Sequence, residues 1–274
     1  MKRKLLLGLL MLLGIFNAAC ASTGKVLYVT HEPGKWHKYT PQLEKFKEIG
    51  ERAKWDVTVW TGEHHAQVEK LKTPDFGLGY DAIVYNFCFA SARDLEACNN
   101  LMNQTRKNGV PAMLIHCSMH SFWGTYKPGR KSGIKLDGKV HSDPKLVKEW
   151  GHSHSDEAFP VWGDFTGVAS TGHGPKKPVV VVSLKDHPAT ARLGDGYTTK
   201  NTELYNNYYV LDKVIPLVKG TQGKATATIM WECPQGKSKV MGLSLGHDVT
   251  DWEFEPFQNM LIDGVNYMIA NPKN

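Results

Sequence analysis

Short apolar runs alternate with helix-periodic segments along the first half of the chain. The runs that predict strands span residues 25–30, 56–60, 80–87 and 111–115. The segment that begins at Thr40 and the segment 91–108 instead place apolar side chains three or four positions apart, which is typical of helices with one buried face. Alternating strands and helices predict a mostly parallel sheet with right-handed crossovers and helices on both faces. The expected fold is therefore α/β, of a flavodoxin-like or Rossmann-like kind.

Local signals predict where these two helices begin and where the second one ends. Thr40 precedes Pro41, so we expect Thr40 as the N-cap and Pro41 in the first turn. Ser91 and Asp94 have the spacing of a capping box, and Gly109 is expected to stop the helix that follows them.

The second half of the chain loses its periodicity between residues 124 and 178, where Gly, Pro, Ser, His and Trp accumulate. Connections of this length are usually functional or disordered, and we expect an irregular insertion. Strand-like runs return over residues 179–184, 225–231 and 239–245. A last helix is expected from about Pro256. Without an internal repeat or a low-complexity tract, residues 22–274 are expected to form one domain.

The N-terminus has the features of an export signal. A basic head precedes a short apolar stretch and then small residues, which predicts a secretory signal peptide over residues 1–21. Ala18-Ala19-Cys20 also resembles a lipoprotein cleavage signal, which would make Cys20 a lipid anchor, whereas cleavage after Ala21 is the alternative. Both alternatives predict an exported bacterial protein, either periplasmic or tethered to the membrane as a lipoprotein.

Charge and cysteine content exclude two classes of protein. Removal of residues 1–19 takes away three basic residues, so the formal net charge falls from +6 to +3, without a long basic run. Nucleic acid is therefore not expected as a partner. The cysteines at positions 88, 98, 117 and 233 are too few for a disulfide scaffold, although one bridge with open connectivity would fit an oxidising compartment.

Histidines follow three of the predicted strands. His31 or His37 follows the first strand, His116 follows the strand 111–115, and His247 follows the strand 239–245. Because the carboxyl ends of parallel strands share one edge of a sheet, these imidazoles are expected to converge there. Converging neutral imidazoles can hold a divalent metal, move protons or bind sugar hydroxyls.

Neighbouring residues add candidates of several kinds. Gly246 permits a close backbone approach, and Asp248 is expected to orient the ring of His247. His120 lies four residues after His116, which would place both on one face if a helix begins at once. Cys117 is an alternative nucleophile, but its neighbours are not the small residues of a nucleophile elbow.

Two further groups of residues suggest the kind of ligand. Glu203 and Tyr205 offer a carboxylate and a phenol in a polar stretch, where they would bind metal, transfer protons or face solvent. Tryptophans and tyrosines gather around the irregular middle and the His247 segment, at Trp123, Tyr126, Trp150, Trp162 and Trp252. Aromatic faces pack against sugar rings, and no glycine-rich phosphate loop is present, so a neutral sugar is favoured over a nucleotide.

Taken in order, several short motifs resemble those of one known family. They are Trp36-His37 before the Thr-Pro helix start, Tyr80-Asp-Ala-Ile-Val-Tyr, Leu-Ile-His116-Cys-Ser, Trp123 to Tyr126, Gly172-His173-Gly-Pro, Asp186-His187-Pro188, Thr202-Glu203-Leu-Tyr205 and Ser244-Leu-Gly246-His247-Asp248. This set resembles the ThuA-like (trehalose-utilisation) proteins, a branch of the class I glutamine amidotransferase-like fold, over nearly all of the mature chain. The amidotransferase pattern Gly-x-Cys-x-Gly is absent around Cys117.

The resemblance implies a role in the catabolism of disaccharides or other glycosides, including 3-keto derivatives, and a divalent metal such as zinc. The implied site residues are His37, His116, His173, Glu203 and His247. We therefore expect an exported enzyme that cleaves a glycoside or 3-keto-glycoside by hydrolysis or elimination. A non-catalytic carbohydrate-binding module is the alternative, and a cysteine hydrolase that uses Cys117 is a third.

Roles follow for each candidate residue. The expected catalytic residues are His116, Glu203 and His247. The expected metal ligands are His116, His120, Glu203 and His247. The residues expected to bind substrate are His37, Trp123, Tyr126, His173, Tyr205 and Asp248.

Overall fold

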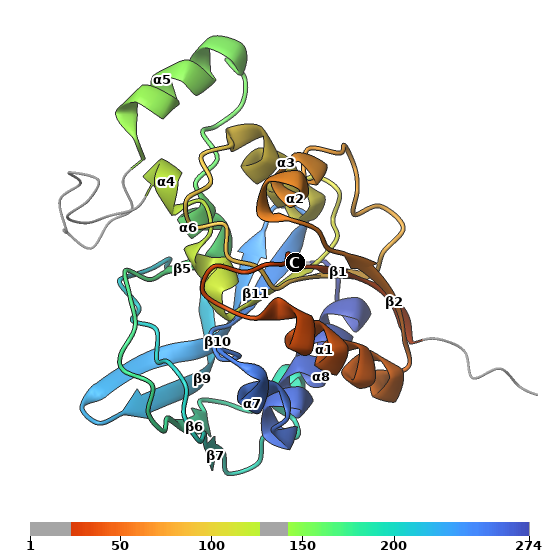
Figure 1. Ribbon diagram of the computed structural model, residues 1–274, viewed down its shortest axis with the longest axis vertical. Coiled ribbons are helices and arrows are strands. Elements are labelled where there is room, and N and C mark those ends of the chain that lie inside the picture. The colour runs from red at the N-terminus through yellow and green to blue at the C-terminus, as the bar shows by residue number, and fades with distance from the viewer. Residues whose placement is uncertain (1–22, 127–141, 274) are drawn as a thin grey trace, which may run out of the picture.

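The computed structural model describes residues 23–126 and 142–273. Within them a nine-stranded mixed sheet runs in the order β2-β1-β3-β4-β11-β10-β9-β6-β7 (Figure 1). The parallel half contains β2 (Trp55–Trp60), β1 (Gly24–Val29), β3 (Ala82–Tyr85), β4 (Ala112–Ile115) and β11 (Ser238–Leu243). The antiparallel half contains β10 (Ala225–Gln235), β9 (Ile215–Gln222), β6 (Val180–Ser183) and β7 (Tyr197–Thr198). A separate pair is formed by β5 (Val168–Ala169) and β8 (Tyr209–Val210).

Helices cover both faces of the parallel half. One face carries α1 (Tyr39–Ala53), α7 (Val249–Trp252) and α8 (Glu255–Ala270). The opposite face carries α2 (His64–Lys70), α3 (Leu95–Arg106) and α6 (Trp162–Thr166). The remaining helices are α4 (Trp123–Tyr126) and α5 (Pro144–Ser153), with short 3₁₀ turns η1 (His116–His120) and η2 (Pro188–Thr190). The α/β class expected from the sequence is confirmed.

Strand β1 shows how the sequence divides the core into two layers. Val26 and Tyr28 pack with Phe46 of α1 on one face, and Leu27 and Val29 pack into the cluster on the other face. This follows from the two-residue period of a strand, which sends successive side chains to opposite faces. Strands buried on both faces read as continuous apolar runs, which is why β1, β3 and β4 could be predicted.

The sheet differs from the prediction in its second half. A mostly parallel sheet was expected, but β10, β9, β6 and β7 all pair antiparallel, so only the core of the sheet is parallel. For β9 and β10 the cause is a tight hairpin: Gly223 takes a left-handed φ of 59° between them and lets the chain turn back at once. A hairpin of this kind joins antiparallel neighbours, whereas parallel ones need a long crossover.

Both predicted helix starts require correction. Helix α1 begins at Tyr39, and Thr40 lies inside it; the carboxylate of Glu32 accepts hydrogen bonds from the N–H groups of Tyr39 (2.8 Å) and Thr40 (3.1 Å) instead. Helix α3 begins at Leu95 with Asp94 alone as N-cap, accepting from Ala97 N at 2.9 Å, so Ser91 takes no part in a capping box.

The stretch 124–178 is also less irregular than expected. It contains part of α4, all of α5 and α6, and strand β5. Asp143 caps α5 through hydrogen bonds from Lys145 N and Leu146 N, and such a cap leaves no trace in the apolar periodicity of the sequence. Residues 127–141, like the predicted leader 1–21 with Cys20, lie outside the described residues.

The described residues also bear on two features of the chain, its disulfides and its membrane-spanning helices. All four cysteines of the described residues are free and buried, so the disulfide that seemed open to the sequence does not form among them. Among helices of the described ranges, none has the length and apolar character needed to cross a bilayer.

Candidate functional site

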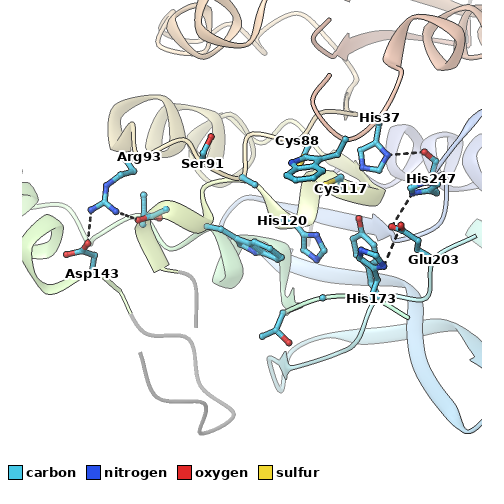
Figure 2. A pocket seen from close by; sticks show the side chains of 18 of the residues that line it. His37, Cys88, Ser91, Arg93, Cys117, His120, Asp143, His173, Glu203 and His247 are labelled. Atoms are coloured by element: carbon cyan, nitrogen blue, oxygen red, sulfur yellow. Dashed lines mark hydrogen bonds and ion pairs between the residues drawn. The ribbon is translucent and has the colours of Figure 1, made fainter. Parts of the chain in front are cut away.

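The carboxyl ends of β1, β4 and β11 meet beside a cavity of about 1100 Å³. Strand β2 lies on one side of β1 and β3 on the other, so the strand order reverses there, which is the usual place for a ligand crevice in an open α/β sheet. Figure 2 shows His37, His247, Glu203 and His173 gathered at one end of the cavity. The predicted convergence of strand-end residues is thus present.

His116 occupies the sharp turn from β4 into η1. Its φ is 46°, in the left-handed region that residues other than glycine seldom adopt, and the residue is only 2% exposed. Its Nδ1 lies 2.7 Å from the carbonyl oxygen of Ser244. Because a carbonyl oxygen only accepts, Nδ1 carries the proton and the lone pair of the neutral ring is on Nε2.

His37 is fixed in the same manner. It lies in the loop between β1 and α1, and its Nδ1 donates to the carbonyl oxygen of His247 at 3.0 Å. Its ring centre is 4.9 Å from that of His116 and 4.9 Å from that of His247. Burial, reinforced by the two neighbouring imidazoles, lowers the pKa of His37 to about 3, so this ring is neutral at physiological pH.

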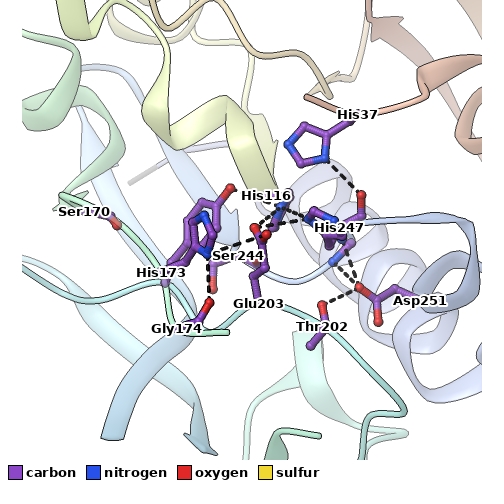
Figure 3. A network of polar contacts seen from close by, with 12 residues as sticks. His37, His116, Ser170, His173, Gly174, Thr202, Glu203, Ser244, His247 and Asp251 are labelled. Carbon is purple, nitrogen blue, oxygen red and sulfur yellow. Dashed lines mark hydrogen bonds and ion pairs between the residues drawn. The ribbon is translucent and has the colours of Figure 1, made fainter. Parts of the chain in front are cut away.

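Glu203 joins the imidazoles from the other half of the sheet. It lies in the segment between β7 and β8, and its Oε2 is 3.1 Å from His247 Nδ1 and 3.6 Å from His116 Nε2, while Oε1 is 3.5 Å from His173 Nδ1 (Figure 3). Burial alone would raise the pKa of this carboxyl, but its contacts with the imidazoles of His116 and His247 outweigh burial and hold the pKa below its ordinary value. Glu203 is therefore ionised at neutral pH.

The donor set fits a divalent metal ion. One ring nitrogen from each of His37, His116 and His247 lies within 4.8 Å of the other two, and all three residues are buried. Metal-ligating histidines usually donate their second ring N–H to a carbonyl or carboxylate, as His37 and His116 do here. Three imidazoles with a carboxylate beside them and open cavity in front are typical of a catalytic zinc site, which keeps one position for water or substrate.

Tyr205 and His120 form an aromatic wall next to this group. The Tyr205 hydroxyl donates to His116 Nε2 at 3.1 Å and also interacts with the Cys117 thiol. If a metal ion occupied His116 Nε2, the hydroxyl would still have the thiol as a partner. The His120 ring stacks on Tyr205 with 4.1 Å between centres. Residues 116–120 form a 3₁₀ turn with three residues per turn, so His116 and His120 do not share a helix face as the sequence suggested. The histidine that completes the group with His116 and His247 is therefore His37, and not His120.

The residues expected to bind substrate have different surroundings. Trp123 and His173 both line the cavity, and the His173 side chain is 44% exposed at its edge. Tyr126 ends α4, but its side chain lies outside the described residues. Asp248 is not among the residues that line the cavity, and it does not orient the ring of His247 as expected: its carboxylate caps α7 by accepting from Thr250 N at 3.0 Å.

Cys117 lines the cavity but lacks the features of an activated nucleophile. It is 6% exposed, and burial raises the pKa of its thiol well above the ordinary value. A nucleophile on a strand-to-helix elbow occupies the strained turn itself, and here His116 has that place. The thiol therefore remains protonated at neutral pH, which disfavours the cysteine hydrolase alternative.

Sequence reasoning missed two buried polar residues behind the imidazoles. Asp251 accepts hydrogen bonds from the backbone of Gly246 and His247, and Gln42 donates to the carbonyl oxygens of the same two residues. Gln42 lies on the buried face of α1 and Asp251 in α7. The polar residue at position 42 in an otherwise apolar helix stripe was the signal that could have found one of them.

The fold of this chain is similar to that of two solved structures. A putative ThuA-like protein from Parabacteroides merdae ATCC 43184 superposes with a TM-score of 0.63 at 19% identity, covering 91% of this chain and 91% of that chain. Another from Bacteroides uniformis ATCC 8492 gives a TM-score of 0.59 at 16% identity, covering 90% and 92%. No family model and no curated protein matches the chain. The chain therefore has the fold of these two ThuA-like structures.

Proposed function

We propose that this protein is an exported, metal-assisted enzyme of carbohydrate catabolism that cleaves a glycoside carrying a keto group at sugar carbon 3. The observation that carries the proposal is the meeting of three buried imidazoles with one ionised carboxylate at the end of a large cavity. The ThuA-like fold and the leader predicted from the sequence support the choice of sugar substrate and of compartment.

The chemistry follows from the keto group. It acidifies the hydrogen on carbon 2, and the Glu203 carboxylate is the base that removes this proton. The electron pair forms a double bond between carbons 1 and 2 as the glycosidic bond breaks, and the departing oxygen takes a proton from the cavity edge, where His173 lies. A bound divalent ion would polarise the keto oxygen and so stabilise the charge that develops there.

The other residues hold this arrangement in place. His37, His116 and His247 are the ligands proposed for the ion, and the carbonyl oxygens of His247 and Ser244 hold two of these rings in the required tautomer. His247 also contacts Glu203, so the base and the ligand group are positioned together. Elimination followed by addition of water would give the products of hydrolysis.

Turnover of a 3-keto-glucoside with a chromogenic leaving group tests the proposal. We expect leaving-group release by the zinc-loaded protein, and a 10²- to 10⁴-fold lower kcat in Glu203→Gln, because that is the usual contribution of a general base. His116→Ala should also lose turnover. Glu149→Gln and His152→Ala, which alter exposed residues of α5, are matched controls that should keep it.

Two results would count against the proposal. Turnover by Glu203→Gln and His116→Ala at the wild-type rate would exclude these residues from the reaction. Saturable sugar binding without any turnover, unchanged by zinc, would instead favour a carbohydrate-binding module.

A further inference from the structure

A single buried carboxylate oxygen connects the two segments that carry His247 and Glu203. Asp251 Oδ2 accepts hydrogen bonds from the hydroxyl of Thr202 (2.6 Å), from His247 N (2.9 Å) and from Gly246 N (3.2 Å), as Figure 3 shows in part. Thr202 directly precedes Glu203 in the chain. The two segments are remote in sequence, since positions 202 and 247 are 45 positions apart.

The backbone around His247 is shaped to meet this oxygen. Gly246 has a φ of 104°, and a β-carbon there would lie 3.1 Å from both Ile115 and Phe257, so the sharp turn after β11 requires glycine. The turn aims the N–H groups of two successive residues at one acceptor. The Gly246 carbonyl oxygen, in turn, accepts from Trp252 Nε1 at 3.2 Å.

Asp251 is separate from the cavity itself. It is 6% exposed and is not among the residues that line the cavity, so its hydrogen bonds reach the site through the residues it holds. The pair that it aligns is the closest contact between Glu203 and an imidazole of the site, His247 Nδ1 to Glu203 Oε2 at 3.1 Å. Loss of the connecting oxygen would free the two segments to move relative to one another.

We propose that Asp251 is a positioning residue, which sets the distance between the His247 ring and the Glu203 carboxylate by binding the backbone of one segment and the Thr202 hydroxyl of the other. The effect expected of Asp251 on turnover rests on the proposed function, whereas its expected effect on the structure does not. Residues that orient metal ligands typically contribute 10- to 100-fold to metal affinity or activity.

Asp248 provides a matched control. It is also an aspartate at the start of α7, but its carboxylate accepts from Thr250 N and Thr250 Oγ1 alone. Asp251→Ala and Asp248→Ala would therefore both weaken this short helix. Only Asp251→Ala would cut the connection between Thr202 and His247.

The experiment compares three variants of the full mature chain by zinc titration, turnover and amide exchange. Asp251→Ala is expected to lower zinc affinity and kcat by 10- to 100-fold with KM nearly unchanged, and Asp251→Asn, which keeps an acceptor oxygen, to recover most of both. Asp248→Ala should keep wild-type zinc affinity and kcat. Should Asp251→Ala fail to fold, Thr202→Val, which removes one of the three donors to Asp251 Oδ2, is expected to lower zinc affinity and kcat in the same way by a smaller factor.

Amide exchange of the zinc-free protein separates the two proposals. Asp251→Ala is expected to speed exchange in both the segment 200–206 and the segment 244–248, whereas Asp248→Ala should affect only residues near Thr250. This result would stand even if the wild-type protein proved to bind no zinc and turn over no keto-glycoside. Equal losses of zinc affinity and kcat in Asp248→Ala, or exchange at residues 200–206 unchanged in Asp251→Ala, would overturn the positioning role.

Discussion

His116 combines backbone strain, burial and a fixed tautomer at one position. A left-handed φ at a residue with a β-carbon is unfavourable by roughly 1–3 kcal/mol, and such positions persist where the surrounding structure holds them, often at functional sites. Here the holding contact is the hydrogen bond from Nδ1 to Ser244 O. The result is an imidazole whose Nε2 lone pair is presented to the other two rings.

His37 makes the stability of the zinc-free protein depend on pH. Because burial and the neighbouring imidazoles lower its pKa to about 3, while an unfolded histidine titrates near 6.5, the unfolded chain binds an extra proton between these values. This contribution is fully present above about pH 6.5 and is lost as the pH falls toward 3. It amounts to on the order of 5 kcal/mol.

Denaturant unfolding at a series of pH values checks this prediction. The free energy of unfolding of His37→Gln should fall less steeply between pH 6.5 and 4 than that of the wild type. His152→Gln, at an exposed position of α5, should follow the wild-type curve. Parallel curves for His37→Gln and wild type would show that His37 is not neutral in the folded protein.

Helix α1 shows how a residue outside an element can set where the element begins. Its first two N–H groups donate to Glu32, seven and eight residues earlier, and the negative charge also suits the positive end of the helix dipole. The loop between β1 and α1 is thereby closed over itself, with His37 inside it. The contact with Glu32 therefore both closes this loop and helps to position His37, one of the proposed metal ligands.

Glu32→Ala should therefore destabilise the protein by about 1 kcal/mol, the usual effect of losing an N-terminal cap. Thr40→Ala should change stability little, because Thr40 is an exposed residue inside the helix and not its cap. Thermal or denaturant unfolding measures both. A larger loss in Thr40→Ala than in Glu32→Ala would restore the capping expected from the sequence.

The elements that could be predicted from sequence are those whose own residues determine them. Strands β1, β3 and β4 are buried on both faces and stand out as apolar runs, and α8 has a clear apolar stripe. The start of α1 could not be found, because its cap is remote in sequence. The antiparallel half could not be found either, because strand direction depends on which neighbour a strand pairs with, and periodicity carries no such information.

At the scale of the whole molecule, the site combines residues from the parallel half of the sheet with one residue from the segment that follows β7. The parallel half contributes His37, His116 and His247 from strand ends, and the segment between β7 and β8 contributes Glu203. Strand ends are predictable from sequence, and so was the shared position of the three imidazoles. The part played by Asp251 was not, because its partners at positions 202 and 246–247 come together only in the folded chain.

The packing of the whole molecule also predicts thiol behaviour. Since Cys88, Cys98, Cys117 and Cys233 are all free and buried, the folded chain 22–274 should react slowly with thiol reagents, and four thiols should appear on unfolding. Reductant should leave the melting temperature unchanged. Thiol counting before and after denaturation tests this, and rapid alkylation of Cys117 with loss of activity would instead support a cysteine nucleophile.

The central claim is that His37, His116 and His247 form one metal site next to Glu203. Crystals of the mature protein grown with zinc, with data collected on both sides of the zinc absorption edge, test it most directly. We predict an anomalous peak about 2.0–2.1 Å from one ring nitrogen of each histidine. Zinc bound only elsewhere, or three empty imidazoles in crystals soaked with excess zinc, would contradict the account.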